Sequence, residues 1–232
     1  MERRRLLQFA AGVGAMGAFG ADDAIRKLLD LTMEPRSLDD WHLACADHLH
    51  AVRTRPPTQA HRDLLVDLAT LQRQLSLGGP DTAELYRVVA VLASYEGSVL
   101  TRLADSGAAI RWYRTAKSAA DASGDLDLRA RVRAHEAGHS LYGLRDPGTV
   151  LALCEKAERI AGTSPSIGLV MTRRIKAHAL ARLGRHEEAL AELRRFLELA
   201  HRDLPTIEGW WDGIGRLHLT ESQVHAAAGR TE

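Results

Sequence analysis

Small and apolar residues repeat at a regular interval along residues 90–200. In each copy a small residue is followed three positions later by Leu, so the two share one face of a helix. Further along each copy another small or apolar residue recurs at a fixed place. The aligned sets are Gly97, Gly138 and Ala177; Leu100, Leu141 and Leu180; and Ala116, Ala157 and Phe196. Small residues where two helices touch predict one antiparallel helix pair in three copies, with a fourth copy beginning near Gly215.

Gly, Pro and capping residues mark where the predicted helices begin and end. Ser37 followed by Asp40 has the pattern of a capping box, and Pro56-Pro57 ends the helix that it opens. After a break at residues 78–80, Asp81 or Thr82 caps the next helix. The other helices are predicted over residues 21–31, 58–77, 108–122, 126–144, 149–161, 169–183, 187–201 and 217–228. No convincing segment alternates as a strand does, so an all-α fold is predicted.

Composition supports helix packing and limits the kinds of partner. Aromatic residues make up only 5% of the chain, whereas strands favour aromatic and β-branched side chains. The formal net charge is +1, which indicates neither a nucleic-acid nor a membrane-surface partner. Cys45 and Cys154 are too few for a disulfide scaffold, and their apolar surroundings predict buried free thiols. No phosphate loop, nucleophile elbow or usable dinucleotide motif is present, so no cofactor is expected.

Residues 1–33 form a segment of their own, for which two interpretations stand. Arg3, Arg4 and Arg5 precede an apolar stretch rich in Gly and Ala that ends in small residues near Gly20. This is the arrangement of an export signal, and the paired arginines would make it a twin-arginine signal. The same residues can instead form a linker helix of a cytoplasmic protein. The stretch is too short and too rich in Gly for a good membrane span, so no membrane partner is expected.

Residues 135–139 read His-Glu-Ala-Gly-His and match the H-E-x-x-H motif of zinc hydrolases. On a helix the two histidines share a face, and the glutamate can polarise a zinc-bound water. A hydrolase also needs a third protein ligand, and the nearest downstream carboxylates, Glu155 and Glu158, stand in no ligand motif. Because Gly138 occupies the small-residue position of the repeat, the repeat explains the motif without a metal. A non-catalytic chain is therefore expected, with a zinc site at His135 and His139 as the alternative.

Residues 177–190 carry the repeat most clearly, and their pattern of Ala and Leu is similar to the tetratricopeptide consensus. The interval is about 40 residues instead of the usual ~34, so longer loops are expected. Residues 40–49, 107–125 and 136–142 give the chain a resemblance to the C-terminal sensor region of XRE-type helix-turn-helix transcriptional regulators from high-GC bacteria. The resemblance implies a right-handed superhelical stack of antiparallel helix pairs, an α-solenoid, over residues 37–232. It also favours the cytoplasmic interpretation of residues 1–33.

In tetratricopeptide stacks the first helix of each pair lines a concave groove, beside the small-residue contact. Carried onto this chain, that arrangement implies a polar, His-rich and basic groove. Its site residues are Arg102, His135, His139, Tyr142, Arg174, His178 and Arg182, together with Ser94, Ser98, Thr101 and Gln223. Arginines and histidines on one face favour a carboxylate-bearing or otherwise acidic ligand. Protonation of the histidines is expected to raise the affinity for that ligand as the pH falls towards ~6.

The sequence therefore predicts a binding module of a bacterial transcriptional regulatory system that recognises a peptide, a protein or a small acidic effector. No DNA-reading helix is recognisable, so the chain alone is not expected to bind specific DNA. The helix predicted over residues 217–228 lacks a partner helix after it. It is expected to pack on another part of a longer protein or on a second copy of this chain. The alternatives are an exported protein of the same fold and a zinc hydrolase.

Overall fold

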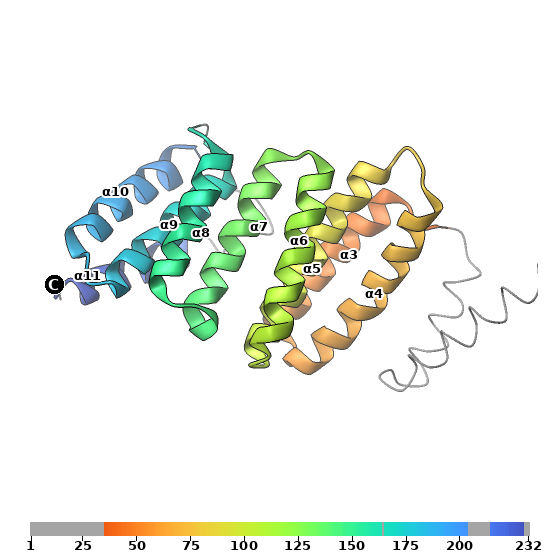
Figure 1. Cartoon of the computed structure of the whole chain (residues 1–232), viewed down its shortest axis with the longest axis horizontal. Helices are drawn as coiled ribbons and strands as arrows, with labels where there is room; N and C mark the ends of the chain where they lie inside the picture. The colour runs from red at the N-terminus through yellow and green to blue at the C-terminus, as the bar shows by residue number, and fades with distance from the viewer. Residues whose placement is uncertain (1–34, 164, 204–213, 230–232) are drawn as a thin grey trace, which may run out of the picture.

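The computed structural model describes residues 35–163, 165–203 and 214–229, and the regular elements in these ranges are all helices (Figure 1). They are α3 (Leu38–Thr54), α4 (Pro57–Leu77), α5 (Thr82–Arg102), α6 (Ser106–Ser123), α7 (Leu126–His139), α8 (Pro147–Ala161), α9 (Ile167–Arg182), α10 (His186–Asp203) and α11 (Ile214–Ala227), with a π-helical turn, η2 (Ser140–Leu144), after α7. The all-α prediction is confirmed. None of the described helices is long and apolar enough to cross a membrane. The segment 1–33, with its predicted helix 21–31, lies outside the described residues.

Short polar side chains cap the first N–H groups of several helices. Ser37 Oγ accepts a hydrogen bond from the Asp40 N–H and donates one to Asp40 Oδ2, which confirms the predicted capping box. Four other residues cap their helices through the N–H three positions on: Asp105, Asp125, Asp146 and Ser166. Pro57 and Pro147 stand at the start of α4 and α8, where a missing N–H costs no helical hydrogen bond.

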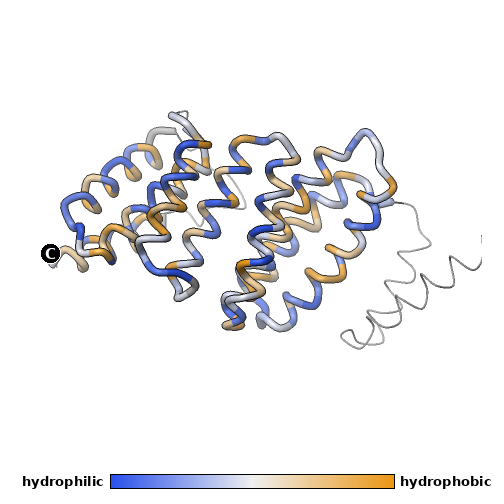
Figure 2. Tube along the Cα trace, in the orientation of Figure 1, coloured by the Kyte–Doolittle hydropathy of each residue, from blue (hydrophilic) through white to orange (hydrophobic). Residues whose placement is uncertain are grey.

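Helices that follow one another in the chain pack as pairs, and alternate helices also touch. α5 packs on α6, α7 on α8 and α9 on α10. In addition α3 packs on α5, α5 on α7, α7 on α9 and α9 on α11, so these five helices form one continuous row, called the inner row below. Figure 2 shows polar and apolar residues alternating along the helices, as expected for helices that bury one face.

Neighbouring helices approach closely at the small-residue position of the repeat. A Cβ added to Gly97 would lie 2.9 Å from the ring of Tyr113 in α6. One added to Gly138 would lie 3.0 Å from Cδ1 of Ile175 in α9. Ala177, at the same position of the third copy, is fully buried. The prediction that small residues stand where helices touch is therefore confirmed.

Two local predictions are wrong. Gly168 was expected in a loop but stands in the first turn of α9, where a Cβ would lie only 2.6 Å from the Cβ of Ala130. The single helix predicted over residues 126–144 is broken, because α7 ends at His139 and the chain continues as η2. Within η2, Gly143 has a φ of 105°, a left-handed conformation that residues with a Cβ rarely adopt.

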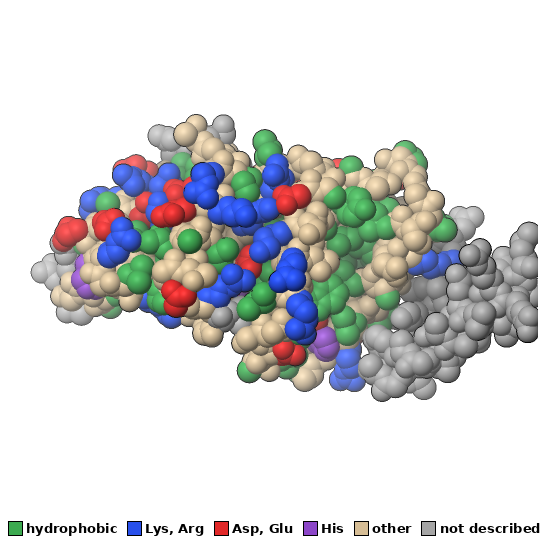
Figure 3. Space-filling model, viewed as in Figure 1, with side chains coloured by type: hydrophobic (Ala, Val, Ile, Leu, Met, Phe, Trp, Pro, Cys, Tyr) green, Lys and Arg blue, Asp and Glu red, His purple; other side chains and the backbone are tan. Residues whose placement is uncertain are grey.

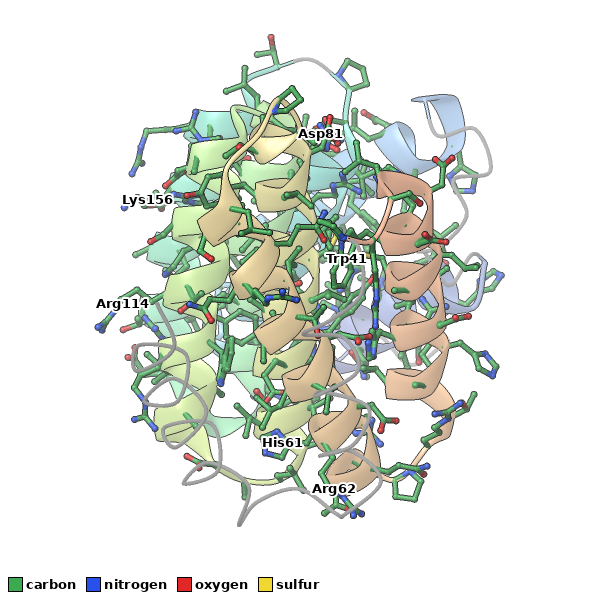
Figure 4. All side chains as sticks on the ribbon, turned by 90° about the vertical axis from the view of Figure 1, so that its right-hand side faces the viewer. Trp41, His61, Arg62, Asp81, Arg114 and Lys156 are labelled. Carbon is green, nitrogen blue, oxygen red and sulfur yellow. The ribbon has the colours of Figure 1, made fainter. Side chains whose placement is uncertain are left out.

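Apolar side chains fill the interior of the molecule, and charged side chains cover its outer helices. Trp41 is fully buried and points inward, whereas Arg114 of α6 and Lys156 of α8 point away from the molecule (Figure 4).

Cys154 is buried and Cys45 is half-buried, and neither forms a disulfide. Burial raises the pKa of both thiols to about 12, so they stay protonated at neutral pH. The prediction of buried free thiols is confirmed for Cys154, whereas Cys45 is free but only half-buried.

Candidate functional site

A cavity of about 840 Å³ lies along the inner row, reaching from α3 to α11. All five inner helices and the turn η2 contribute to its lining, and its volume is within the usual range for ligand pockets. The seven site residues implied by the sequence all line it: Arg102, His135, His139, Tyr142, Arg174, His178 and Arg182. Ser98, Thr101 and Gln223 line it as well. The structure therefore brings together residues from four segments that are far apart in the chain.

The lining of this cavity carries positive charge without negative charge. Among the residues that the structure describes, no Asp or Glu lines it. The basic side chains in the lining are Arg53, Arg102, Arg174, Arg182, His135, His139 and His178. The opposite side of the molecule, seen in Figure 3, carries Asp and Glu side chains among its Lys and Arg side chains. A chain that is almost neutral as a whole thus gathers seven basic side chains in the lining of one cavity.

The charged residues of α9 lie on two different faces of the helix. The basic residues of α9 that line the cavity stand four positions apart and so share one face of the helix: Arg174, His178 and Arg182. On another face Arg173 lies 3.1 Å from Glu158 Oε1 and also pairs with the buried Glu192. Lys176 Nζ lies 2.7 Å from Glu158 Oε2. Arg173 and Lys176 are therefore neutralised by carboxylates on the outer side of the helix, whereas Arg174, His178 and Arg182 face the cavity.

Backbone carbonyls hold two of the cavity arginines in place. Arg102, at the end of α5, donates a hydrogen bond to the carbonyl of Val52 in α3. Arg182, at the end of α9, donates to the carbonyl of Leu141 in η2, 2.5 Å away. Within the described part of the chain neither guanidinium pairs with a carboxylate. A guanidinium has five N–H donors, so each of these two retains donors that can hold a carboxylate or phosphate.

Aromatic and histidine rings form a run from the core to the cavity. The Nε2 atoms of His135 and His139 lie 3.2 Å apart, so one nitrogen donates to the other, and their rings stand edge to face. Behind them, the fully buried Tyr113 has its ring centroid 5.9 Å from that of His135. At the other end Tyr142 is 77% exposed, with its ring centroid 6.1 Å from that of His139.

Burial, and to a smaller extent the positive charges of Arg174 and Arg182, lower the pKa of His178 from 6.5 to about 4. His178 is therefore neutral at pH 6, and its protonation does not contribute to the expected rise in affinity near that pH. Within the described residues its Nε2 is buried without a hydrogen-bond partner. A polar ligand group in the cavity would satisfy this nitrogen, and an anion there would raise its pKa.

The H-E-x-x-H motif lies in α7, but its glutamate is engaged elsewhere. Glu136 is buried, with Oε2 2.6 Å from Lys117 Nζ and Oε1 2.8 Å from Arg145 Nη2. Both carboxylate oxygens are thus held by cations, and Glu136 is not placed to polarise a water at the histidines. Glu158, considered as a third ligand, pairs with Arg173 instead. No three His, Cys, Asp or Glu side chains gather as a metal site in the described ranges.

Sequence reasoning missed the contributions of α3 and α11 and misplaced one residue. Arg53 of α3 and Thr220 of α11 line the cavity, although only Gln223 was expected from α11. Helix α3 precedes the three full copies and α11 carries only the start of a fourth copy, so the alignment assigned one residue of α11 and none of α3. Ser94 was expected in the groove, but it is fully buried and donates to the carbonyl of Val91. This expectation is wrong because Ser94 lies on the packed side of α5.

No family model, curated protein or solved structure matches this chain. Its function is therefore argued from the cavity and from the side chains that line it.

Proposed function

We propose that this chain is a non-catalytic binding module that holds an acidic ligand in the cavity of the inner row. The observation that carries the proposal is the lining of four arginines and three histidines without a described Asp or Glu. An anion in such a cavity gains charge-assisted hydrogen bonds from guanidinium groups, and these are stronger where water is partly excluded. The ligand class is a peptide, a protein segment or a small effector that carries acidic groups.

We further propose that α3 to α11 form a right-handed superhelical stack of the tetratricopeptide kind. Three observations support this arrangement. The inner helices touch in strict succession, each inner helix from α5 to α9 also packs on the helix that follows it, and the small residues of the repeat stand at close helix contacts. In such a stack the inner row lines the concave side, which is where the cavity lies.

We propose a regulatory role on the resemblance of residues 40–49, 107–125 and 136–142 to the sensor region of XRE-type regulators. In that role the chain is cytoplasmic, and ligand binding changes what it presents to a DNA-binding partner. Export by the twin-arginine route is the alternative. The mass of the protein from its native host separates the two, because export removes about the first twenty residues.

The experiment for the acidic ligand compares Arg174→Gln with Arg114→Gln, an equal charge change on the exposed surface of α6. Isothermal titration at physiological salt uses three probes: inorganic phosphate, citrate and a hexaglutamate peptide. At least one probe should bind the unchanged protein, and Arg174→Gln should weaken that binding by roughly tenfold. Arg114→Gln should leave it unchanged. The proposal fails if no acidic probe binds, or if both variants lose the same affinity.

A further inference from the structure

The turn η2 redirects the backbone at the cavity. In an α-helix the N–H of Arg145 would bond to the carbonyl of Leu141, four residues back. Here it bonds to the carbonyl of Ser140, five residues back, at 3.2 Å. The carbonyl of Leu141 accepts the guanidinium of Arg182 from the neighbouring inner helix instead. The π-helical turn thus links the end of α7 to a cation of α9. Turns of this type are frequent at functional sites.

The same turn presents an aromatic ring to the cavity. Tyr142 has φ and ψ of −85° and 26°, outside the helical region, and the adjacent Gly143 has φ of 105°. The Tyr142 side chain lines the cavity while remaining 77% exposed. At the aligned positions of the first and third copies stand Thr101 and Ala181, which are not aromatic. The middle copy alone therefore offers an exposed ring, and the geometry that exposes it departs from a straight helix.

Tyr142 and Arg182 are neighbours in space because Arg182 is bonded to the residue that precedes Tyr142. An acid held by the remaining donors of this guanidinium therefore lies beside the η2 turn that carries Tyr142, and both side chains line the same cavity. Large exposed aromatic side chains in a concave site pack well against planar groups. The ring of His139 lies near that of Tyr142, at a centroid distance of 6.1 Å and an interplanar angle of 51°.

We propose that the ligand of this cavity is a planar-ring anion, whose ring packs on Tyr142 while its acidic group binds Arg182. This inference rests on the proposed function and adds that the acidic ligand also carries a planar ring. The shared chemistry is a ring next to a carboxylate or phosphate, and it can come from an aromatic carboxylate or from a nucleoside phosphate. Tyr142 sets the preference for the ring, and Arg182 holds the acid whether or not a ring is attached.

The test measures binding of two matched probe pairs by isothermal titration. One pair is 2-naphthoate and cyclohexanecarboxylate; the other is adenosine 5′-monophosphate and ribose 5-phosphate. In at least one pair the aromatic member should bind about fivefold to tenfold more tightly than the other member. The pair that shows this preference tells whether the natural ligand is an aromatic carboxylate or a nucleoside phosphate. Tyr142→Phe should keep the preference, and Tyr142→Leu should bring the ratio close to one. Arg182→Gln should weaken the binding of both members of the pair.

Gly143→Ala tests the role of the turn. A Cβ at Gly143 or at Gly184 would touch no atom within 4 Å, and both residues have positive φ, so both substitutions act through the backbone alone. Gly184 does not line the cavity and provides the matched control. Gly143→Ala should remove the preference for the ring, whereas Gly184→Ala should keep it.

The outcomes separate the two proposals. If the aromatic and non-aromatic members bind equally, or if Tyr142→Leu keeps the preference, the inference about the ring is wrong. The acidic-ligand proposal then still stands where Arg174→Gln weakens both members. If no member of either pair and no acidic probe binds, both proposals are wrong.

Discussion

Replacing His178 with Gln should change how the stability of the protein depends on pH. The imidazole lies in the cavity between Arg174 and Arg182 on the same face of α9. Burial first, and then these two positive charges, lower its pKa from 6.5 to about 4. Gln is a polar side chain without a titrating group, so His178→Gln removes this effect while keeping a polar residue at the site.

The sign and size of the effect follow from the two pKa values. Between pH 6.5 and pH 4 the unfolded chain binds a proton at this histidine, whereas the folded chain does not. The free energy of unfolding therefore falls as the pH falls through this window, and it levels off below the folded pKa. One pKa unit corresponds to about 1.4 kcal/mol, so the contribution of His178 to the loss is roughly 3 kcal/mol at pH 4.

Urea unfolding followed by circular dichroism at pH 7 and pH 4 measures this contribution. The unchanged protein should lose roughly 3 kcal/mol more stability between the two values than His178→Gln does. His50→Gln, at an exposed position of α3, is the control and should behave like the unchanged protein. The reasoning is refuted if His178→Gln loses as much stability as the unchanged protein over this range.

Three further predictions concern packing, metal and DNA. Gly168→Ala should cost about 1–3 kcal/mol in thermal unfolding, because its Cβ would lie 2.6 Å from Ala130 Cβ and 3.0 Å from the backbone of Arg131; Gly107→Ala, exposed in α6, should be neutral or stabilising. Metal analysis after purification without added zinc should find no stoichiometric zinc; zinc that His139→Ala removes would support the hydrolase. Gel-shift assays at physiological salt should find no specific binding to the protein's own upstream region; nanomolar specific binding would mean that a DNA-reading element was missed.

The helix pairs could be predicted because they follow from local periodicity, and the cavity face because the resemblance to tetratricopeptide stacks implies that the first helix of each pair lines a groove. Residues four apart share a helix face, so aligning the copies at Gly97, Gly138 and Ala177 assigned the same face to each inner helix. The capping box at Ser37 is likewise a local pattern. Such patterns are read within one or two helical turns, and together with the resemblance they pointed to seven of the residues that line the cavity.

The features that the sequence did not reveal depend on contacts between distant segments. The turn at Tyr142 depends on Gly143 and on the bond from Arg182, which comes from another helix pair. The low pKa of His178 follows from its burial beside two arginines in the folded chain. The engagement of Glu136 by Lys117 joins residues of different helices. None of these contacts has a pattern within one helix that could predict it.

The central claim is that the cavity arginines hold an acidic ligand, and the arginine side-chain N–H signals of the labelled protein test it most directly. These signals are followed by NMR during titration with the tightest acidic probe and are assigned by Arg→Gln substitutions. We expect the largest changes at Arg102, Arg174 and Arg182, with Arg114 on the exposed surface of α6 unchanged. Changes confined to arginines outside the cavity, or spread evenly over all arginines, would contradict it.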